Sequence, residues 1–124
     1  MQLLLLLVLA LLPPALFLVY IMYMDRNEPE PWGLILLLLL LGGLSCLPAI
    51  AAETLLDMLP LFAAGGLTGA ALQSFIQIAP AEELSKFLFL FLATWKHRHF
   101  TEENDGIVYG GTVALGFAAL ENIF

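Results

Sequence analysis

Long uninterrupted apolar segments set the first limit on what this chain can fold into. Residues 34–41 contain no polar side chain, and further apolar segments lie near residues 2–24, 32–51, 71–95 and 106–124. Each is close to the roughly 20 residues that an α-helix needs to cross the hydrocarbon core of a bilayer. We therefore predict an all-α fold, a polytopic bundle of about four transmembrane helices that forms a single domain over residues 1–124.

The composition excludes a water-soluble globular domain. Hydrophobic residues make up 61% of the chain and charged residues 12%, against roughly 45–50% and 25% in ordinary soluble domains. The formal net charge of −7 argues against nucleic-acid binding, which needs a basic surface to neutralise phosphates. The first apolar segment lacks the basic start of a secretory signal and contains Pro13 and Pro14, so we expect it to remain as a membrane helix.

The basic residues predict how the bundle is oriented. Arg26 lies in the first connection and Lys96 and Arg98 lie in the third, whereas residues 1–24 and 52–70 contain no basic residue. By the positive-inside rule, connections 25–31 and 96–105 are expected in the cytoplasm and the N-terminus outside. Aromatic residues typical of a membrane interface flank the same connections: Tyr20, Tyr23, Trp32, Trp95 and Tyr109.

The segment near 71–95 contains ionisable residues among Phe, Leu and Ile. Glu83 is twelve residues before Trp95, which places it roughly 18 Å below the interface and near the middle of a ~30 Å core. Ionisable groups at this depth are expensive and are a functional-site hypothesis by default. Lys86 is spaced to pair with either Glu82 or Glu83 on one helix face.

Two adjacent carboxylates in a low dielectric do not both ionise easily, which favours a shared or retained proton and acid–base chemistry. The alternative is an ion pair that eases insertion or fixes helix packing. That alternative explains Glu82 with Lys86 but leaves the second glutamate at a cost of about 2.5–3.5 kcal/mol. Gln73, Ser74 and Gln77 precede the pair and are expected to hydrogen-bond between helices or to line a polar cavity.

The last apolar segment begins with Asp105, a favourable N-cap, and ends with a carboxylate. Glu121 lies roughly 23 Å from the same membrane interface below which Glu83 lies roughly 18 Å. The carboxylates of Glu83 and Glu121 could therefore meet if the two helices pack together. The alternative places Glu121 among headgroups on the outer side, and the sequence leaves both open. One helix face is expected to carry a small-residue stripe that ends in Glu121: Gly106, Gly110, Ala114 and Ala118.

Two further stretches are less regular. The connection 52–70 is broken by proline and glycine, carries Glu53 and Asp57, and is expected to hold a short interfacial helix. His97 and His99 lie in the basic connection and are expected to be solvated. Carboxylates suit hard cations, but the membrane-depth residues lack the His or Cys of a typical zinc site, so we predict no metal and no cofactor.

Several motifs, in this order, resemble those of a known family. They are DRNEPEPW at 25–32, EELSK at 82–86, and DGIVYG and GFAALEN within 105–122. This combination resembles the PrsW family of glutamic-type intramembrane proteases, related to the CAAX-processing and bacteriocin-processing membrane proteases. The resemblance covers most of the chain and implies a multi-pass endopeptidase of the bacterial inner membrane, surrounded by lipid. Its implied substrate is a single-pass membrane protein, which in some members of the family is an anti-sigma factor.

The resemblance also assigns residues. Glu82 and Glu83 match the paired-glutamate motif, Lys86 its basic partner, and Phe117 and Glu121 the second motif. Asn122, which follows directly, is taken as a supporting residue with Lys86 and Phe117. Family members continue into further spans that carry histidines, so the chain is expected to correspond to the N-terminal part and to lack the C-terminal spans.

These observations lead to two functional hypotheses. In the first, one of Glu82 and Glu83 takes a proton from water as the water attacks a peptide carbonyl, and its neighbour or Glu121 protonates the leaving amine. Which glutamate is the base stays open. In the second, the same Glu/Lys cluster serves a non-catalytic membrane scaffold or a proton-coupled carrier, through subunit assembly or proton relay.

Overall fold

The computed structural model describes residues 2–26, 28–63 and 65–123, and all regular secondary structure in these ranges is helical. The prediction of an all-α fold is therefore confirmed. The helices are α1 (Gln2–Met24), α2 (Trp32–Leu44), α3 (Cys46–Leu56), the 3-10 helix η1 (Pro60–Ala63), α4 (Gly66–Leu72), the π-helix η2 (Gln73–Ile78), α5 (Ala79–Thr94) and α6 (Glu103–Glu121).

Two helical stretches are long and apolar enough to cross a membrane: Leu4–Met24, with 21 residues, and Trp32–Leu56, with 25. Only 11% of the most apolar window of the first stretch is buried inside the protein. A core helix of a soluble protein would bury its leucines, whereas exposed leucines all around a helix are typical of contact with lipid. The predicted spans near 71–95 and 106–124 are not among these two stretches and stay predictions.

The second apolar stretch continues further than expected. The backbone at Ser45 is helical, and its hydroxyl donates a 2.6 Å hydrogen bond to the carbonyl of Gly42, so α2 runs into α3 with little interruption. Pro48 lies in the first turn of α3, where a missing N–H does little harm. The helix therefore ends at Leu56, beyond the expected boundary at residue 51 and past the charged Glu53.

The region expected to form an interfacial helix is organised differently. Gly66 has a φ of +75°, a left-handed conformation that favours glycine, and it starts the helix α4. α4, η2 and α5 follow one another without a gap, so this helical segment begins at Gly66, earlier than the predicted boundary at residue 71.

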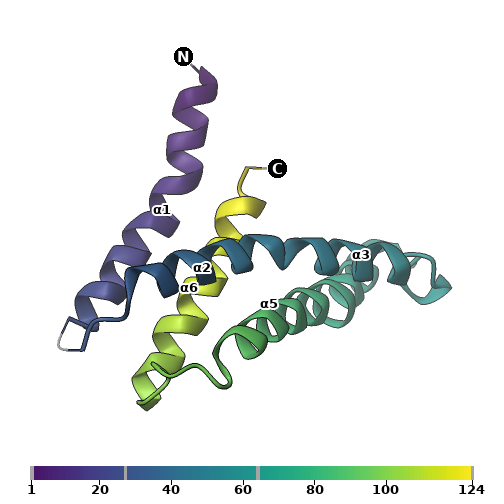
Figure 1. Ribbon diagram of the computed structural model, residues 1–124. Helices are drawn as coiled ribbons and strands as arrows, with labels where there is room; N and C mark the ends of the chain where they lie inside the picture. The colour runs from purple at the N-terminus through teal and green to yellow at the C-terminus, as the bar shows by residue number, and fades with distance from the viewer. Residues whose placement is uncertain (1, 27, 64, 124) are drawn as a thin grey trace.

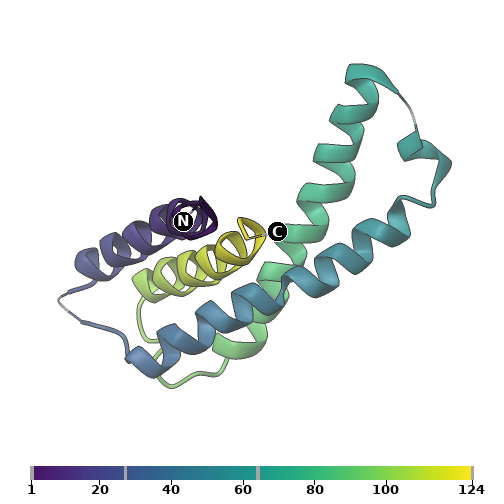
Figure 2. The same ribbon diagram turned by 90° about the horizontal axis from the view of Figure 1, so that it is seen from above.

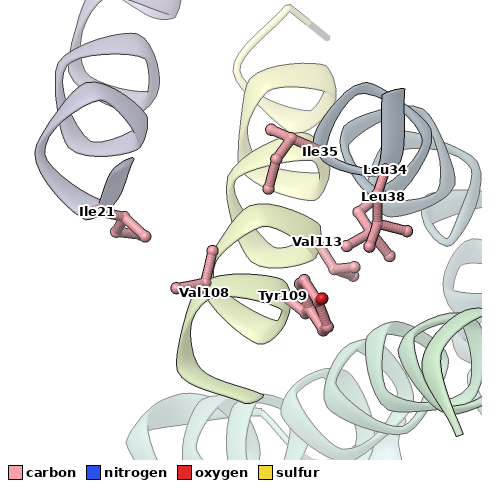
Figure 3. Packing of buried hydrophobic residues seen from close by; sticks show 7 residues of the cluster. All are labelled: Ile21, Leu34, Ile35, Leu38, Val108, Tyr109 and Val113. Carbon is pink, nitrogen blue, oxygen red and sulfur yellow. The ribbon is translucent and has the colours of Figure 1, made fainter. Parts of the chain in front are cut away.

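α6 is the central helix and packs against α1, α2, α3 and α5 (Figure 1). Figure 1 shows α2 crossing in front of α6, and Figure 2 shows α1 and α6 side by side. Beyond this crossing, α3 contacts α5. Figure 3 shows the main core, to which α1, α2 and α6 each contribute. Its buried residues are Ile21, Leu34, Ile35, Leu38, Val108, Tyr109 and Val113.

The crossing of α2 and α6 depends on a glycine from each helix. A Cβ atom added at Gly42 would collide with the backbone carbonyl of Val113, and one added at Gly116 would collide with that of Leu39. The glycine of α6 at this close approach, Gly116, is not part of the predicted small-residue stripe. Ala114 of that stripe is exposed, because the buried face of α6 is instead set by its larger residues, with Gly116 at the close approach.

The two basic connections meet at one end of the bundle. The side-chain amide of Asn104 donates a 3.2 Å hydrogen bond to Asp25, which joins them. The N-cap of α6 is Glu102 and not Asp105, whose carboxylate accepts hydrogen bonds from the backbone N–H groups of Thr101 (2.7 Å) and Glu102 (2.8 Å). Burial alone would raise the pKa of Asp105, but these N–H donors stabilise the carboxylate and hold the pKa below its usual value.

Candidate active site

The ionisable residues of α5 form one compact cluster. The Lys86 ammonium lies 3.2 Å from Glu82 Oε2 and 2.8 Å from Glu83 Oε1. The side chains of Lys86 and Glu82 are 16% and 21% exposed, whereas Glu83 is 72% exposed. The predicted spacing thus places both carboxylates within reach of one cation, with Glu83 on the more open side.

Phe117 brings the second predicted motif to the first. Its ring lies beneath the Lys86 ammonium, 4.0 Å from nitrogen to ring centroid, and Phe117 itself is 4% exposed. An ammonium over an aromatic face is attracted by the electron density of the ring, more strongly where water is excluded. The contact joins α5 to α6 and places Lys86 between the two carboxylates and the ring.

Glu121 and Asn122 are placed differently from each other. Glu121 ends α6 and is exposed. It lies one helical turn beyond Phe117, whose ring contacts Lys86, although the ion pairs found in the described ranges do not include Glu121. Asn122 instead donates a 3.1 Å hydrogen bond to the carbonyl of Ala10, which tethers the end of α6 to α1.

Helix α3 contributes residues that the sequence did not assign to the site. The Cys46 thiol lies 3.8 Å from the carbonyl of Phe117. Gln77 of η2 donates a 3.0 Å hydrogen bond to the carbonyl of Glu53 and a 2.6 Å hydrogen bond to the carboxylate of Asp57. The expectation that Gln77 bonds between helices is confirmed, but its partner could not be foreseen, because the sequence did not show that α3 continues past Glu53.

The two histidines lie in the connection between α5 and α6, as expected. Their rings are 5.4 Å apart, and Arg98 donates a 3.2 Å hydrogen bond to Nε2 of His99. His99 also borders a polar cavity of about 230 Å³ at the end where the connections meet. The other residues that border this cavity are Glu28, Pro29, Glu30, Thr101 and Asp105.

The fold and the site together define a class of protein: helical membrane proteins with a cluster of ionisable residues held between packed helices. Within that class, the chain belongs to the PrsW family, described as PrsW family intramembrane metalloprotease, whose profile matches residues 30–124. The chain is a membrane protein of that family.

Named relatives agree with this assignment. The chain is 34% identical to Protease PrsW of Geobacillus kaustophilus, 35% to that of Bacillus subtilis and 35% to that of Clostridioides difficile. The alignments cover 90–93% of the chain but only 47–49% of each relative, so the chain spans about half their length. No solved structure matches the chain.

The family description includes a metal, which the described residues do not accommodate by themselves. A catalytic zinc typically has three protein ligands. Among residues 2–26, 28–63 and 65–123, no three His, Cys, Asp or Glu side chains are grouped so that they could hold an ion. Glu82 and Glu83 instead bind the Lys86 ammonium, and a cation already occupies the position between them.

Proposed function

We propose that this chain carries the paired-glutamate part of a PrsW-type intramembrane endopeptidase. The observation that supports the proposal best is the cluster in which Lys86 contacts Glu82, Glu83 and the ring of Phe117. It unites both family motifs at one place between α5 and α6. Glu121, one helical turn beyond Phe117 on α6, supports the proposal as a further carboxylate on that helix.

In the proposed reaction, one carboxylate of the pair is ionised and takes a proton from water as the water oxygen attacks a peptide carbonyl. The other carboxyl group of the pair, or Glu121, gives a proton to the leaving amine. The Lys86 ammonium contacts both carboxylates and offsets part of their negative charge. The general base is thus one member of the pair.

The proposal extends to the setting of the enzyme. We place the protein in the bacterial inner membrane, with connections 25–31 and 96–105 in the cytoplasm and the N-terminus outside. The hydrogen bond between Asn104 and Asp25, which joins these connections, supports a location on one side. The proposed substrate is a single-pass membrane protein, such as an anti-sigma factor, because such a substrate would reach the cluster from the lipid.

Replacing either carboxylate tests the reaction. In the full-length protein, co-expressed with an anti-sigma factor tagged at both ends, Glu82→Gln and Glu83→Gln are each expected to abolish cleavage at unchanged abundance. The amide keeps the shape of the side chain but cannot take a proton from water. The matched control is Glu103→Gln, at the exposed start of α6, which should cleave like the parent protein. Normal cleavage by both Glu82→Gln and Glu83→Gln would rule out the proposed reaction.

A scaffold or proton-coupled carrier is the second candidate, favoured by the contact between Lys86 and Phe117, which stabilises helix packing by itself. A structural role of the ion pair predicts that Glu82→Gln lowers the thermal stability of the detergent-solubilised protein. A catalytic role predicts a stable but inactive variant. Melting temperature and cleavage measured on the same sample separate the two functions.

A further inference from the structure

A π-helix lies directly before the glutamate pair. η2 covers Gln73–Ile78, and α5 follows at Ala79 with Pro80 in its first turn. A π-turn holds one residue more than an α-turn, and each residue of an α-helix turns the chain by about 100°. Relaxing this segment to a regular α-helix would therefore rotate Glu82 and Glu83 by about that angle relative to α4.

Gln77 is the residue that holds η2 against α3. Its side chain is 1% exposed, and its amide nitrogen donates to the carbonyl of Glu53 (3.0 Å) and to the carboxylate of Asp57 (2.6 Å). Both partners are acceptors, so the amide has only one favourable orientation, because a flipped group would place its oxygen against two other oxygens.

That orientation leaves the oxygen of the Gln77 amide without a donor. The Oε1 atom of Gln77 is buried and has no hydrogen-bond partner within the part of the chain that the structure describes. An unsatisfied buried acceptor is unfavourable, because it has lost its hydrogen bonds to water without gaining another partner. The side chain nevertheless keeps this arrangement, which indicates that its two donated bonds decide its position.

Gln77 can influence the orientation of Glu82 and Glu83 because η2 continues directly into α5. Gln77, Ala81 and Ser85 are all buried and recur at every fourth residue, so they share the face that packs towards α3. Glu82 follows Ala81 directly and therefore lies beside this face. The rotation of Gln77 about the helix axis therefore sets the direction of Glu82 and Glu83.

We propose that Gln77 is a positioning residue for the glutamate pair: its amide holds the π-helix at Glu53 and Asp57 and so sets the direction in which α5 presents Glu82 and Glu83. This inference rests on the proposed function. Gln77 acts through the pair and need not touch the peptide, so its loss should lower kcat and leave KM nearly unchanged.

The first test compares two glutamines of the same π-helix in the full-length protein with the doubly tagged anti-sigma factor. Gln77→Leu is expected to lower kcat by about ten- to a hundredfold, since a displaced catalytic group costs this much. It should also shift the pH dependence of kcat, because the surroundings of the pair change. The control is Gln73→Leu, whose amide lies at a long 3.5 Å from Asp57 and whose loss should leave both quantities near those of the parent.

A donor–acceptor exchange keeps the test informative if Gln77→Leu fails to fold. Gln77→Glu places a carboxylate against Asp57 and should be inactive. Adding Asp57→Asn restores a donor and an acceptor between positions 57 and 77, although a carboxylate at 77 cannot donate to the carbonyl of Glu53. The double variant should therefore recover part of the lost kcat. No recovery in a folded double variant would contradict the proposal.

A distance measurement separates this inference from the proposed function. Spin labels replace Leu47 on α3 and Leu84 on α5, which are 63% and 67% exposed, in a Cys46→Ser background. Gln77→Leu should change the distance between the labels, and Gln73→Leu should not, whether or not the protein cleaves anything. An unchanged distance in Gln77→Leu overturns the inference, and so does a changed distance with unchanged kcat. Absence of cleavage by the parent protein overturns the proposed function alone.

Discussion

Lys86 balances the charge of the cluster. Its ammonium contacts two carboxylates and an aromatic ring, and its side chain is only 16% exposed. Taking a charge out of water is costly unless a partner compensates it. Lys86 therefore determines whether Glu82 and Glu83 can both be accommodated between α5 and α6.

Removal of that cation should be more damaging than removal of a surface charge. We expect Lys86→Met to lower the free energy of unfolding by about 3 kcal/mol, because both carboxylates lose their partner. The measurement is the thermal melting of the detergent-solubilised protein. Lys96→Met, in the exposed connection, should melt like the parent protein, and adding Glu82→Gln to Lys86→Met should recover part of the loss. Equal melting temperatures of the Lys86→Met and Lys96→Met variants would contradict the role of Lys86 in compensating the charges of Glu82 and Glu83.

The sequence predicted some of these contacts and not others, for a physical reason. Spacing along one helix places Lys86 within reach of Glu82 and Glu83, so this contact was predictable. The ring of Phe117 beneath Lys86 depends on how α6 packs against α5, and the resemblance alone pointed to that residue. The role of Gln77 depends on a π-turn, which hydrophobic periodicity does not reveal.

The crossing of α2 and α6 is the closest helix contact in the described structure. Gly42 faces the backbone of Val113, and Gly116 faces the backbone of Leu39, so each helix approaches the other where a side chain is missing. Helices in a bilayer gain stability from such close packing, since lipid offers no hydrophobic driving force between them.

A single methyl group at this crossing should be harmful. Gly42→Ala and Gly116→Ala are each expected to destabilise the protein by about 1–3 kcal/mol, because the added carbon meets backbone and the helices must separate. Gly33→Ala is the matched control on α2, since an added Cβ there meets nothing within 4 Å. Denaturation in mild detergent measures all three, and wild-type stability of both crossing variants would show that the helices do not approach so closely.

The helices themselves were largely predictable from the sequence, but their ends and faces were not. Apolar length predicts α1 and the start of α2 at Trp32. The charge of Glu53 suggested that the second apolar helix ends before that residue. In the structure α3 continues to Leu56, and Gln77 of η2 gives this region a polar partner. The face of α6 was misjudged because small residues point to several neighbours: Gly110 approaches Leu90 of α5, and Gly111 approaches Ile21 of α1.

The end of the molecule where the two connections meet is rich in carboxylates. Burial raises the pKa of Asp25 and of Glu30, and the negative charge of Asp105 raises both further. A carboxyl group with a raised pKa in the folded state binds its proton more tightly there than in the unfolded chain. Its penalty is present at neutral pH and is relieved as the pH falls through the folded pKa. Asp105 behaves in the opposite way, since its lowered pKa gives stability that is lost only below its usual value of 3.8.

These signs predict a tighter connection in mild acid. Backbone hydrogen exchange at Glu28 and Glu30, corrected for the intrinsic rate, should slow as the pH falls from neutral towards 4.5, the usual pKa of a glutamate. Glu30 has a raised pKa, so it begins to take up its proton above that value and repulsion falls. Glu30→Gln should exchange slowly at neutral pH already and change less with pH. Glu103→Gln, on the exposed first turn of α6, should keep the parent response. The sign is wrong if exchange in the parent accelerates as the pH falls.

The two apolar helical stretches differ in length, which links the molecule to the thickness of its bilayer. Leu4–Met24 has 21 residues and spans roughly 31 Å, close to a hydrocarbon core of about 30 Å. Trp32–Leu56 has 25 residues and spans roughly 37 Å, so it fits only when tilted. A thicker bilayer favours a more upright α2–α3, and α3 carries the acceptors that hold Gln77. Under the proposed role of Gln77, a change in lipid chain length should therefore alter the orientation of Glu82 and Glu83.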